Sequence, residues 1–204
     1  MNRLQFLLAR TLRNETALQR LSVPQTDLFA ELEGKTVALV GNARALSDQH
    51  HGPEIDAQDL VIRINRAPIP AAVSHGSRTD WLALAVRLPD ADRTRLNPHR
   101  ILWMSPKRKR LDWTSAKSPG FYLHPQAERQ RMQDRLAAPP TTGAMMIDLL
   151  ARSPMRGLTL FGFDFFASQS LSGRRSAAQV PHDFNAEADW VATLMQADPR
   201  IHRV

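Results

Sequence analysis

The sequence lacks cysteine, long apolar runs and repeats. Without cysteine, a disulfide framework is excluded, and nothing requires an oxidising compartment. No segment approaches the roughly 18 consecutive apolar residues of a membrane-spanning helix. No internal repeat or low-complexity tract is present either. The 204 residues therefore fit one domain that is large enough to bury a core.

The charge is unevenly balanced. The chain has 27 Lys and Arg against 20 Asp and Glu, a formal net charge of +7, and an ordinary apolar content of 43%. A basic surface favours an anionic partner, which could be a nucleotide, an acidic sugar, a phospholipid surface or a nucleic acid. Composition alone does not choose among these partners.

Seven short apolar runs predict β-strands, and most are apolar on both faces, as in parallel strands covered by helices. Helical patterns at 126–136, 143–152 and 185–196 follow some of them, so the sequence predicts a doubly wound α/β sheet. The predicted strands are Thr36–Val40, Leu60–Asn65, Trp81–Val86, Arg100–Met104, Phe121–Leu123, Leu158–Phe163 and Ile201–Val204.

Residues 1–33 form a predicted helical extension before a single domain at 34–204. Leu4, Leu7, Leu8 and Leu12 fall near one helical face, which favours an amphipathic helix packed on the domain. A helix lying on a membrane surface is the alternative. Interrupting arginines and the missing cleavage site argue against a secretory signal.

Polar side chains follow the first two predicted strands. Gly41 and Asn42 end the first, and Asn65 and Arg66 end the second. Ligands of open α/β sheets bind outside the carboxyl ends of the strands. We expect both amides, with the guanidiniums of Arg63 and Arg66, to converge on one crevice that suits an anionic nucleotide.

A second cluster, Pro-Pro-Thr-Thr-Gly at 139–143, opens a predicted helix. Thr141, Thr142 and Gly143 at a helix start favour an anion site, because backbone N–H groups and the helix dipole face outward there. A plain threonine N-cap is the alternative. A third cluster places His182 and Glu187 five positions apart at a loop-to-helix junction, a spacing that is weak on its own.

The order of these clusters resembles the long, small and very small sialylmotifs of glycosyltransferase family 29, the sialyltransferases. The resemblance covers residues 36–81 and 139–187, and it includes Gly-Pro-Glu-Ile-Asp at 52–56 and Gly-Ser-Arg-Thr at 76–79. It implies a Rossmann-like fold of the glycosyltransferase A variant type. It also implies an inverting enzyme that moves sialic acid, or a related acidic sugar, from a CMP-sugar donor to a glycan hydroxyl.

The resemblance also implies roles for single residues. His182, with Glu187 of the same motif, is expected to be catalytic, because histidine exchanges protons near neutral pH. No cofactor or metal is expected, since a monophosphate leaving group bears little charge. The residues expected to bind the donor are Gly41, Asn42, Asn65, Arg66, Thr141, Thr142, Gly143, Arg174 and Arg175.

The sequence departs from the family pattern in three ways. Val37 and Met155 stand where animal members have paired cysteines. We also expect no membrane anchor, and both features favour a bacterial and cytoplasmic protein. Phe165-Phe166 stands where the family has a histidine-aromatic motif. Arg174 or Arg175 could replace that histidine if the segment 168–181 closes over the donor.

Other patterns leave alternatives open. Asp90-Ala91-Asp92 is typical of metal-dependent sugar-nucleotide transferases, Lys107–Arg110 could bind nucleic acid or a membrane, and His50-His51 could bind a metal. We expect all three to be solvated loops. A CMP-Kdo or other CMP-sugar transferase, a non-catalytic nucleotide-binding module and a nucleic-acid-binding protein stay as alternative functions. The sequence does not indicate an oligomeric state.

Overall fold

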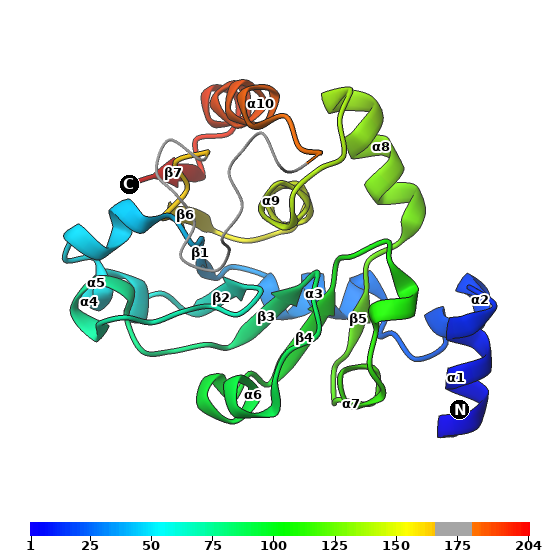
Figure 1. Ribbon diagram of the computed structural model, residues 1–204. Coiled ribbons are helices and arrows are strands. Elements are labelled where there is room, and N and C mark those ends of the chain that lie inside the picture. The colour runs from blue at the N-terminus through cyan, green and yellow to red at the C-terminus, as the bar shows by residue number, and fades with distance from the viewer. Residues whose placement is uncertain (166–180) are drawn as a thin grey trace.

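The computed structural model describes residues 1–165 and 181–204 (Figure 1). Its centre is a seven-stranded sheet in the order β5-β4-β3-β2-β1-β6-β7, in which every pair is parallel. The strands are β1 (Thr36–Val40), β2 (Leu60–Ile64), β3 (Trp81–Leu84), β4 (Arg100–Trp103), β5 (Tyr122–Leu123), β6 (Gly157–Phe161) and β7 (Ile201–Arg203). The predicted doubly wound α/β fold is confirmed.

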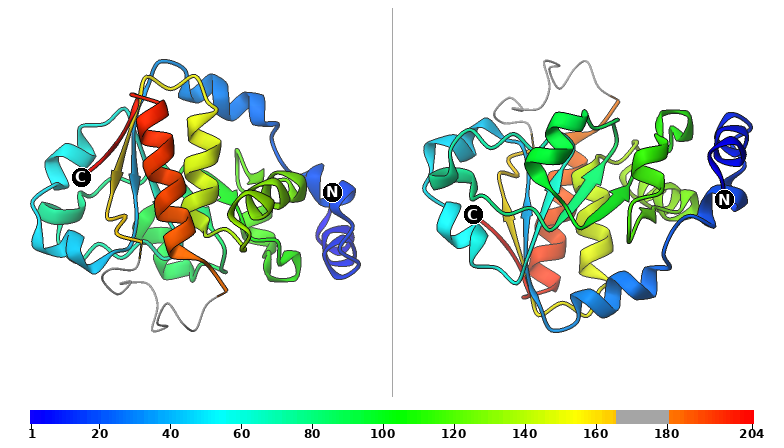
Figure 2. Two further views of the ribbon diagram at one scale, coloured as in Figure 1. Left: turned by 90° about the horizontal axis from the view of Figure 1, so that it is seen from above. Right: turned by 90° about the horizontal axis from the view of Figure 1, so that it is seen from below.

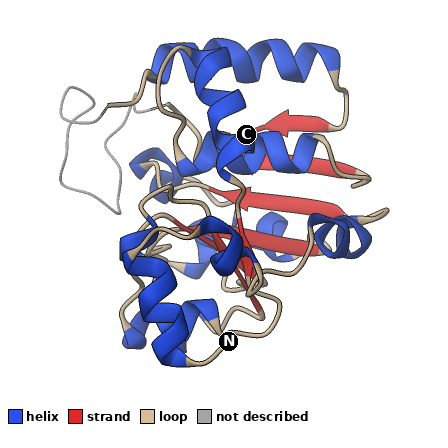
Figure 3. Ribbon diagram, turned by 90° about the vertical axis from the view of Figure 1, so that its right-hand side faces the viewer, coloured by secondary structure: helices blue, strands red, loops and turns tan. Residues whose placement is uncertain are grey.

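Helices cover both faces of the sheet (Figures 2 and 3). One face packs against α3 (Gln25–Leu32), α9 (Thr142–Ala151) and α10 (Phe184–Ala197), with α8 (Gln126–Leu136) beside them. The remaining helices lie toward the other face, and most of them pack against it. These are α1 (Arg3–Thr11), α2 (Glu15–Gln19), η1 (Arg44–Asp48), α4 (Gly52–Asp56), α5 (Ala72–His75), α6 (Asp90–Leu96), η2 (Arg108–Arg110) and α7 (Trp113–Ala116).

Strand β1 shows why the strands are apolar on both sides. Val37 and Leu39 point into the core beneath α3 and α9, whereas Ala38 and Val40 point into the core beneath η1 and α4. Successive side chains of a strand alternate between faces, so a sheet covered twice needs apolar residues at every position. Met155 lies in the same buried cluster as Val37, so apolar packing joins these two positions.

The chain reverses its direction across the sheet at β1. From β1 it adds β2, β3, β4 and β5 on one side, and it then returns to place β6 and β7 on the other. The connections on the two sides of β1 therefore run in opposite directions across the sheet. This topological switch point is where open α/β sheets bind ligands.

Short helices account for most of the differences from the predicted elements. The segments α4, α5, α6 and α7 are too brief to show helical periodicity. The expectation that Asp90 to Asp92 form a solvated loop was wrong, since they make the first turn of α6. Both carboxylates lie in that first turn, where the helix dipole favours negative charge.

The first helix packs on the domain, but of its four predicted leucines only the half-buried Leu7 takes part. Phe6 and Ala9 are buried against β4, η2 and α7, whereas Leu4, Leu8 and Leu12 are exposed. The predicted packing was right, and the predicted packing face was wrong for three of its four leucines. Within residues 1–165 and 181–204, no helix combines the length and apolar character needed to cross a bilayer.

Candidate donor-binding site

A cavity of about 280 Å³ opens at the switch point between β1 and β6. Its walls come from the loops after β1, β2, β3 and β6, from the start of α9 and from the segment that leads into α10. The lining residues are Gly41, Asn42, Ala43, Ile64, Asn65, Ala85, Val86, Thr141, Thr142, Gly143, Ala144, Gly162, Phe163, Asp164, Phe165, His182, Phe184 and Glu187. The sequence clusters at 41–42, 65, 141–143 and 182–187 thus meet in one place.

Gly41 lets the loops after β1 and β6 come together. Its N–H donates to the Phe161 carbonyl at 2.7 Å, and a Cβ at Gly41 would lie 2.3 Å from the Gly162 carbonyl oxygen. A side chain there would force the loops apart. The next residue, Asn42, donates from Nδ2 to the Ile64 carbonyl at 3.2 Å. Its Oδ1 has no partner among the described residues and is available to a ligand.

Asn65 follows β2 in a left-handed conformation, with φ of 55°. Asparagine tolerates this conformation better than most residues. Its Oδ1 accepts from the Ala85 N–H at 2.9 Å, which fixes the loop after β3. The Nδ2 group has no partner within the described part of the chain, so Asn65 can offer a donor to an anion in the cavity.

The start of α9 supplies backbone donors. Thr141 is the N-cap, and its Oγ1 accepts from the Ala144 N–H at 3.0 Å. The N–H groups of Thr142 and Gly143 have no partner within residues 1–165 and 181–204, and both residues line the cavity. Thr141 is therefore an N-cap, which was the alternative to an anion site in the sequence interpretation. The two N–H groups beyond it still make an anion site at the positive end of a helix.

Glu187 is bonded to the first turn of α9. Its side chain is 3% exposed, and its two carboxylate oxygens accept from the Thr141 N–H at 2.6 Å and the Thr141 hydroxyl at 2.8 Å. Burial raises the pKa of Glu187 to about 7, although the Thr141 hydrogen bonds favour the ionised form. Glu187 therefore braces the turn that presents the α9 donors, and its bonds to Thr141 engage both of its oxygens.

His182 is held in a defined tautomer. Its Nδ1 lies 2.7 Å from the Pro139 carbonyl oxygen. A carbonyl only accepts, so Nδ1 carries the proton, and Nε2 of the neutral ring keeps its lone pair. The half-exposed ring borders the cavity beside Phe184. The lone pair on Nε2 is thus the one that His182 can offer to a proton donor.

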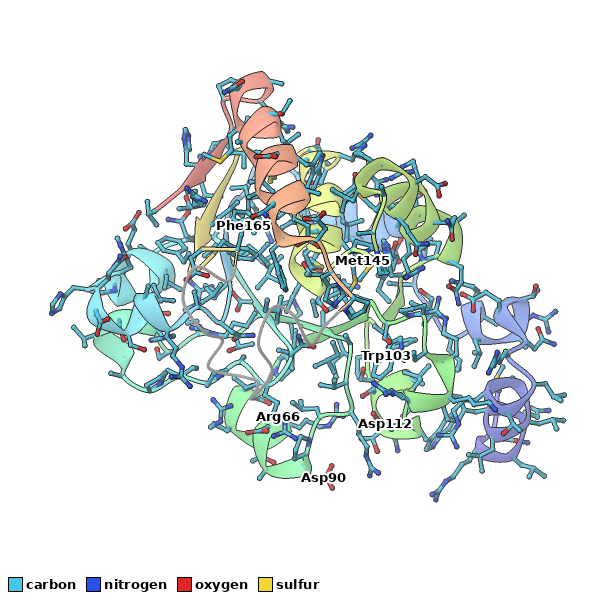
Figure 4. All side chains as sticks on the ribbon, turned by 45° about the horizontal axis from the view of Figure 1, so that its top comes forward. Arg66, Asp90, Trp103, Asp112, Met145 and Phe165 are labelled. Atoms are coloured by element: carbon cyan, nitrogen blue, oxygen red, sulfur yellow. The ribbon has the colours of Figure 1, made fainter. Side chains whose placement is uncertain are left out.

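Some predicted site residues are not part of the cavity. Arg63 is buried and donates to the carbonyls of His75 and Arg78 and to Thr79 Oγ1, so it does not face a ligand. Arg66 is exposed and lies away from Phe165, near α6 (Figure 4). The expected convergence of two guanidiniums on the crevice is therefore not found. Arg174 and Arg175 lie outside the described residues, as does the expected closing segment up to residue 180.

The cavity also contains residues that were not among the predicted site residues. Ala85 and Val86 follow β3, and Gly162, Phe163 and Phe165 follow β6. Their only signal is position, because each set begins where a strand of the central sheet ends. A Cβ on Gly143 would lie 2.7 Å from Phe163 Cε1, so the aromatic ring packs directly over the helix start.

Two other motif fragments form a separate group, which we call the Asp56 cluster: Asp56, Arg63, His75, Ser77 and Arg78. The Asp56 carboxylate accepts from the Ser77 N–H and hydroxyl and from the Arg78 N–H, at 2.8 to 3.0 Å. These bonds lower the pKa of Asp56, against the opposing effect of burial. The Gly-Pro-Glu-Ile-Asp and Gly-Ser-Arg-Thr fragments therefore join α4 to the loop before β3 and do not reach the cavity.

The remaining charged motifs are accounted for elsewhere. In the described residues, no group of three or more His, Asp or Glu is arranged to hold a metal ion. His51 binds Glu54 on the surface. Arg108 is buried and donates to Glu15 and to the His124 carbonyl, so the predicted solvated loop at 107–110 is wrong for this residue.

Comparisons with known proteins show what this chain is similar to. Residues 3–89 match the model of glycosyltransferase family 29 (sialyltransferase). Over 43 residues the chain is 49% identical to the Mus musculus CMP-N-acetylneuraminate-beta-galactosamide-alpha-2,3-sialyltransferase 1. That match covers 21% of this chain and 13% of the mouse protein.

Solved structures share the fold over most of the chain. A mammalian sialyltransferase in complex with Gal-beta-1-3GalNAc-ortho-nitrophenol aligns over 92% of this chain and 76% of its own, with a TM-score of 0.64 and 19% identity. The Campylobacter jejuni sialyltransferase CstII, in complex with the substrate analogue cytidine-5'-monophosphate, aligns over 84% and 80%, with a TM-score of 0.57 and 13% identity. The match over residues 3–89 and the shared fold together confirm the resemblance of this chain to glycosyltransferase family 29, the sialyltransferases.

Proposed function

We propose that the protein is a sialyltransferase-type glycosyltransferase that moves sialic acid from a CMP-sugar donor to a glycan hydroxyl. The supporting observation is that an oriented histidine and a helix N-terminus with two unpartnered N–H groups border one cavity at the switch point of the sheet. A CMP-sugar needs both groups. One must take a proton from the acceptor, and the other must stabilise the charge on the departing phosphate.

In this proposal, His182 is the general base. Its Nε2 accepts the proton of the acceptor hydroxyl while that oxygen attacks the anomeric carbon. The Pro139 carbonyl keeps Nδ1–H in place and so prevents the ring from turning its protonated nitrogen toward the acceptor. Attack from the face opposite the leaving group inverts the configuration.

The leaving CMP phosphate is placed at the start of α9. Its oxygens accept from the N–H groups of Thr142 and Gly143, where the helix dipole favours negative charge. Asn65 Nδ2 adds a neutral donor from the opposite wall, and Asn42 Oδ1 is an acceptor for a hydroxyl or amino group of the donor. Glu187 is a positioning residue here, because it acts through Thr141.

Metal independence and the absence of a cofactor belong to this proposal. Two backbone donors and a side-chain amide replace a divalent ion as the partner of a monophosphate, whose charge is smaller than that of a diphosphate. Calorimetry with CMP in a chelator tests this directly, and undiminished affinity is the expected result. Binding that vanishes with the chelator and returns with manganese would contradict it.

The principal alternative is transfer of another acidic sugar, such as Kdo, from its CMP derivative. It uses the same phosphate and proton-transfer groups, and it differs only in the sugar that lies beside the apolar wall of Ala85, Val86 and Phe163. Incubating the protein with a panel of CMP-sugars and measuring CMP release with and without glycan acceptors separates the two. A cytoplasmic location and a bacterial source stay predictions.

The decisive experiment compares His182→Ala with His50→Ala, the same substitution at an exposed histidine. We expect His182→Ala to lower transfer by about 10²–10⁴-fold, the usual contribution of a general base, and to keep CMP affinity within a few-fold. His50→Ala should match the wild type in both assays. If the His182 variant transfers at a near-normal rate, the base assignment fails. If the wild type binds CMP but releases none from any CMP-sugar, the protein is a non-catalytic nucleotide-binding module.

A further inference from the structure

Helix α1 presents two different apolar faces. Phe6 and Ala9 are buried, and the Phe6 ring packs on Trp113 with their centroids 5.2 Å apart. On the opposite side, Leu4, Leu8 and Leu12 are 76%, 61% and 68% exposed. Residues four apart lie on one side of a helix, so the three leucines form a continuous stripe.

This stripe is unusual for the molecule. In the part of the chain that the structure describes, six large apolar side chains are exposed, and four of them lie within the first 12 residues. Met1 is the fourth, beside the leucines in sequence. Exposed leucines that occur singly need no explanation, but a row along one helix marks an interaction surface.

The charges around the stripe have one sign. Residues 1–14 contain no Asp or Glu, and Arg3 and Arg13 are exposed near the two ends of α1. η2 lies beside α1, tied to it by a 3.0 Å bond from Arg10 Nη1 to the Leu111 carbonyl, and it exposes Lys109 and Arg110. None of these four exposed cations has an ion-pair partner among the described residues.

The nearby carboxylates do not neutralise this surface. Glu15 is bound by Arg108 through a hydrogen bond of 3.0 Å from Nε. Asp112 caps α7 by accepting from the Ser115 N–H at 2.8 Å, and it also lies 3.7 Å from Arg93. Both are therefore engaged by groups of the domain itself, and the exposed face of α1 and η2 stays positive.

We propose that α1 and η2 dock the protein on an anionic phospholipid surface, with Leu4, Leu8 and Leu12 inserted at the level of the acyl chains. An interfacial helix combines such a leucine stripe with cations that reach lipid phosphates. This surface lies beyond the β5 edge of the sheet, at the opposite end of the molecule from β7 (Figures 1 and 2). The inference is independent of the proposed transfer reaction.

A second copy of the chain fits this surface less well. The exposed parts of the three leucines amount to about two whole leucine side chains, which is far less than the roughly 800 Å² that each partner buries in a stable interface. A two-fold contact would also bring the arginines of both copies together without an acidic partner. A lipid surface needs only a narrow apolar stripe and supplies the opposite charge.

The test uses vesicle flotation with the full chain. We expect the protein to float with mixed phosphatidylcholine and phosphatidylglycerol vesicles and not with phosphatidylcholine alone. The triple variant Leu4→Gln, Leu8→Gln, Leu12→Gln should lose at least about tenfold in binding. Lys109→Gln with Arg110→Gln should weaken binding most at low salt, where charge attraction is strongest. Val73→Gln, at an exposed apolar residue elsewhere, is the matched control and should bind like the wild type.

A second measurement places the leucines in the lipid. Because the chain has no cysteine, a single Leu8→Cys variant can be labelled with an environment-sensitive dye, with Val73→Cys as the control. Only the label at position 8 should shift to the blue on adding anionic vesicles. The proposal is overturned if the wild type binds neither vesicle or if the leucine variant binds as well as the wild type. The proposal is also overturned if the wild type is a dimer in solution and the leucine variant is a monomer.

Discussion

Two clusters of polar residues in this molecule belong to the motifs that resemble the family, and their hydrogen bonding differs. In the Asp56 cluster, the carboxylate of Asp56 and the guanidinium of Arg63 are bonded to the protein itself. In the cavity, Asn42, Asn65 and the start of α9 each use one polar group to hold the fold and leave another without a protein partner. The family resemblance therefore includes residues of both clusters. The residues whose hydrogen bonds are all made within the protein support the fold, whereas those with an unpartnered donor or acceptor can bind a ligand.

The physical reason lies in the cost of an unpaired buried group. A buried donor without a hydrogen-bond partner lowers the stability of the folded protein, unless water or a ligand accepts its hydrogen bond. Such groups are expected where the binding of a ligand offsets this loss of stability. A satisfied cluster such as that of Asp56 gains nothing from a ligand. Substitutions in the two groups should therefore affect different measurements.

The largest effect on stability is expected from Arg63→Met. The change removes the donor for the carbonyls of His75 and Arg78 and for Thr79 Oγ1, all in or beside the buried core. Leaving such acceptors unpaired should lower the free energy of unfolding by about 3 kcal/mol or more. Urea denaturation measures this loss.

The matched control for that substitution is Arg66→Met. Arg66 is exposed and lies outside the cavity, so its stability should change by no more than about 0.5 kcal/mol. CMP affinity of both folded variants should stay within a few-fold of wild type. If the Arg63 variant loses CMP affinity while its stability is unchanged, Arg63 binds the donor after all.

The contrast between the groups explains what the sequence could and could not predict. The seven strands were predictable because a doubly covered sheet needs unbroken apolar runs, as in Val37 to Val40. The meeting of Asn42, Asn65, Thr142 and His182 was predictable from strand ends and motif order. The direction of a side chain was not, because Arg63 and Arg66 look alike in sequence although one is buried and the other exposed.

Packing that depends on distant partners was also beyond the sequence. The leucines of α1 looked like its buried face, yet Phe6 and Ala9 fit the surface that β4, η2 and α7 provide. Glu187 looked catalytic by its spacing from His182, and only the fold shows both of its oxygens on Thr141. Phe163 became part of the site because Gly143 leaves room for its ring.

A smaller effect, and one that depends on pH, is expected at Glu187. Its pKa rises from the ordinary carboxyl value of 4.5 to about 7 on folding, because burial disfavours the charge. Between these two values, the folded protein binds a proton that the unfolded chain has released. Glu187 should therefore lower stability as pH rises through this window, by roughly 3 kcal/mol in all.

The measurement compares the wild type with Glu187→Gln in urea at pH 5 and pH 8. Glutamine keeps the shape and can still bond Thr141, but it does not ionise in this range. The stability of the wild type relative to the variant should fall from pH 5 to pH 8. A difference that stays constant would mean that the Thr141 hydrogen bonds hold the folded pKa near its ordinary value.

The smallest expected effect separates the two uses of Asn65. Its Oδ1 holds the loop after β3, and its Nδ2 is free for a phosphate within the described part of the chain. Asn65→Gly removes the side chain and tolerates the left-handed φ of 55°, whereas Asn65→Ala adds backbone strain of about 1 kcal/mol. Both variants should bind CMP about tenfold more weakly, because both lose a hydrogen bond to a charged group worth about 1.4 kcal/mol. Unfolding should distinguish them, with the alanine variant less stable by about the cost of the strain. If the glycine variant binds CMP as tightly as the wild type in calorimetry, Asn65 belongs with the satisfied scaffold, and the phosphate contact rests on α9 alone.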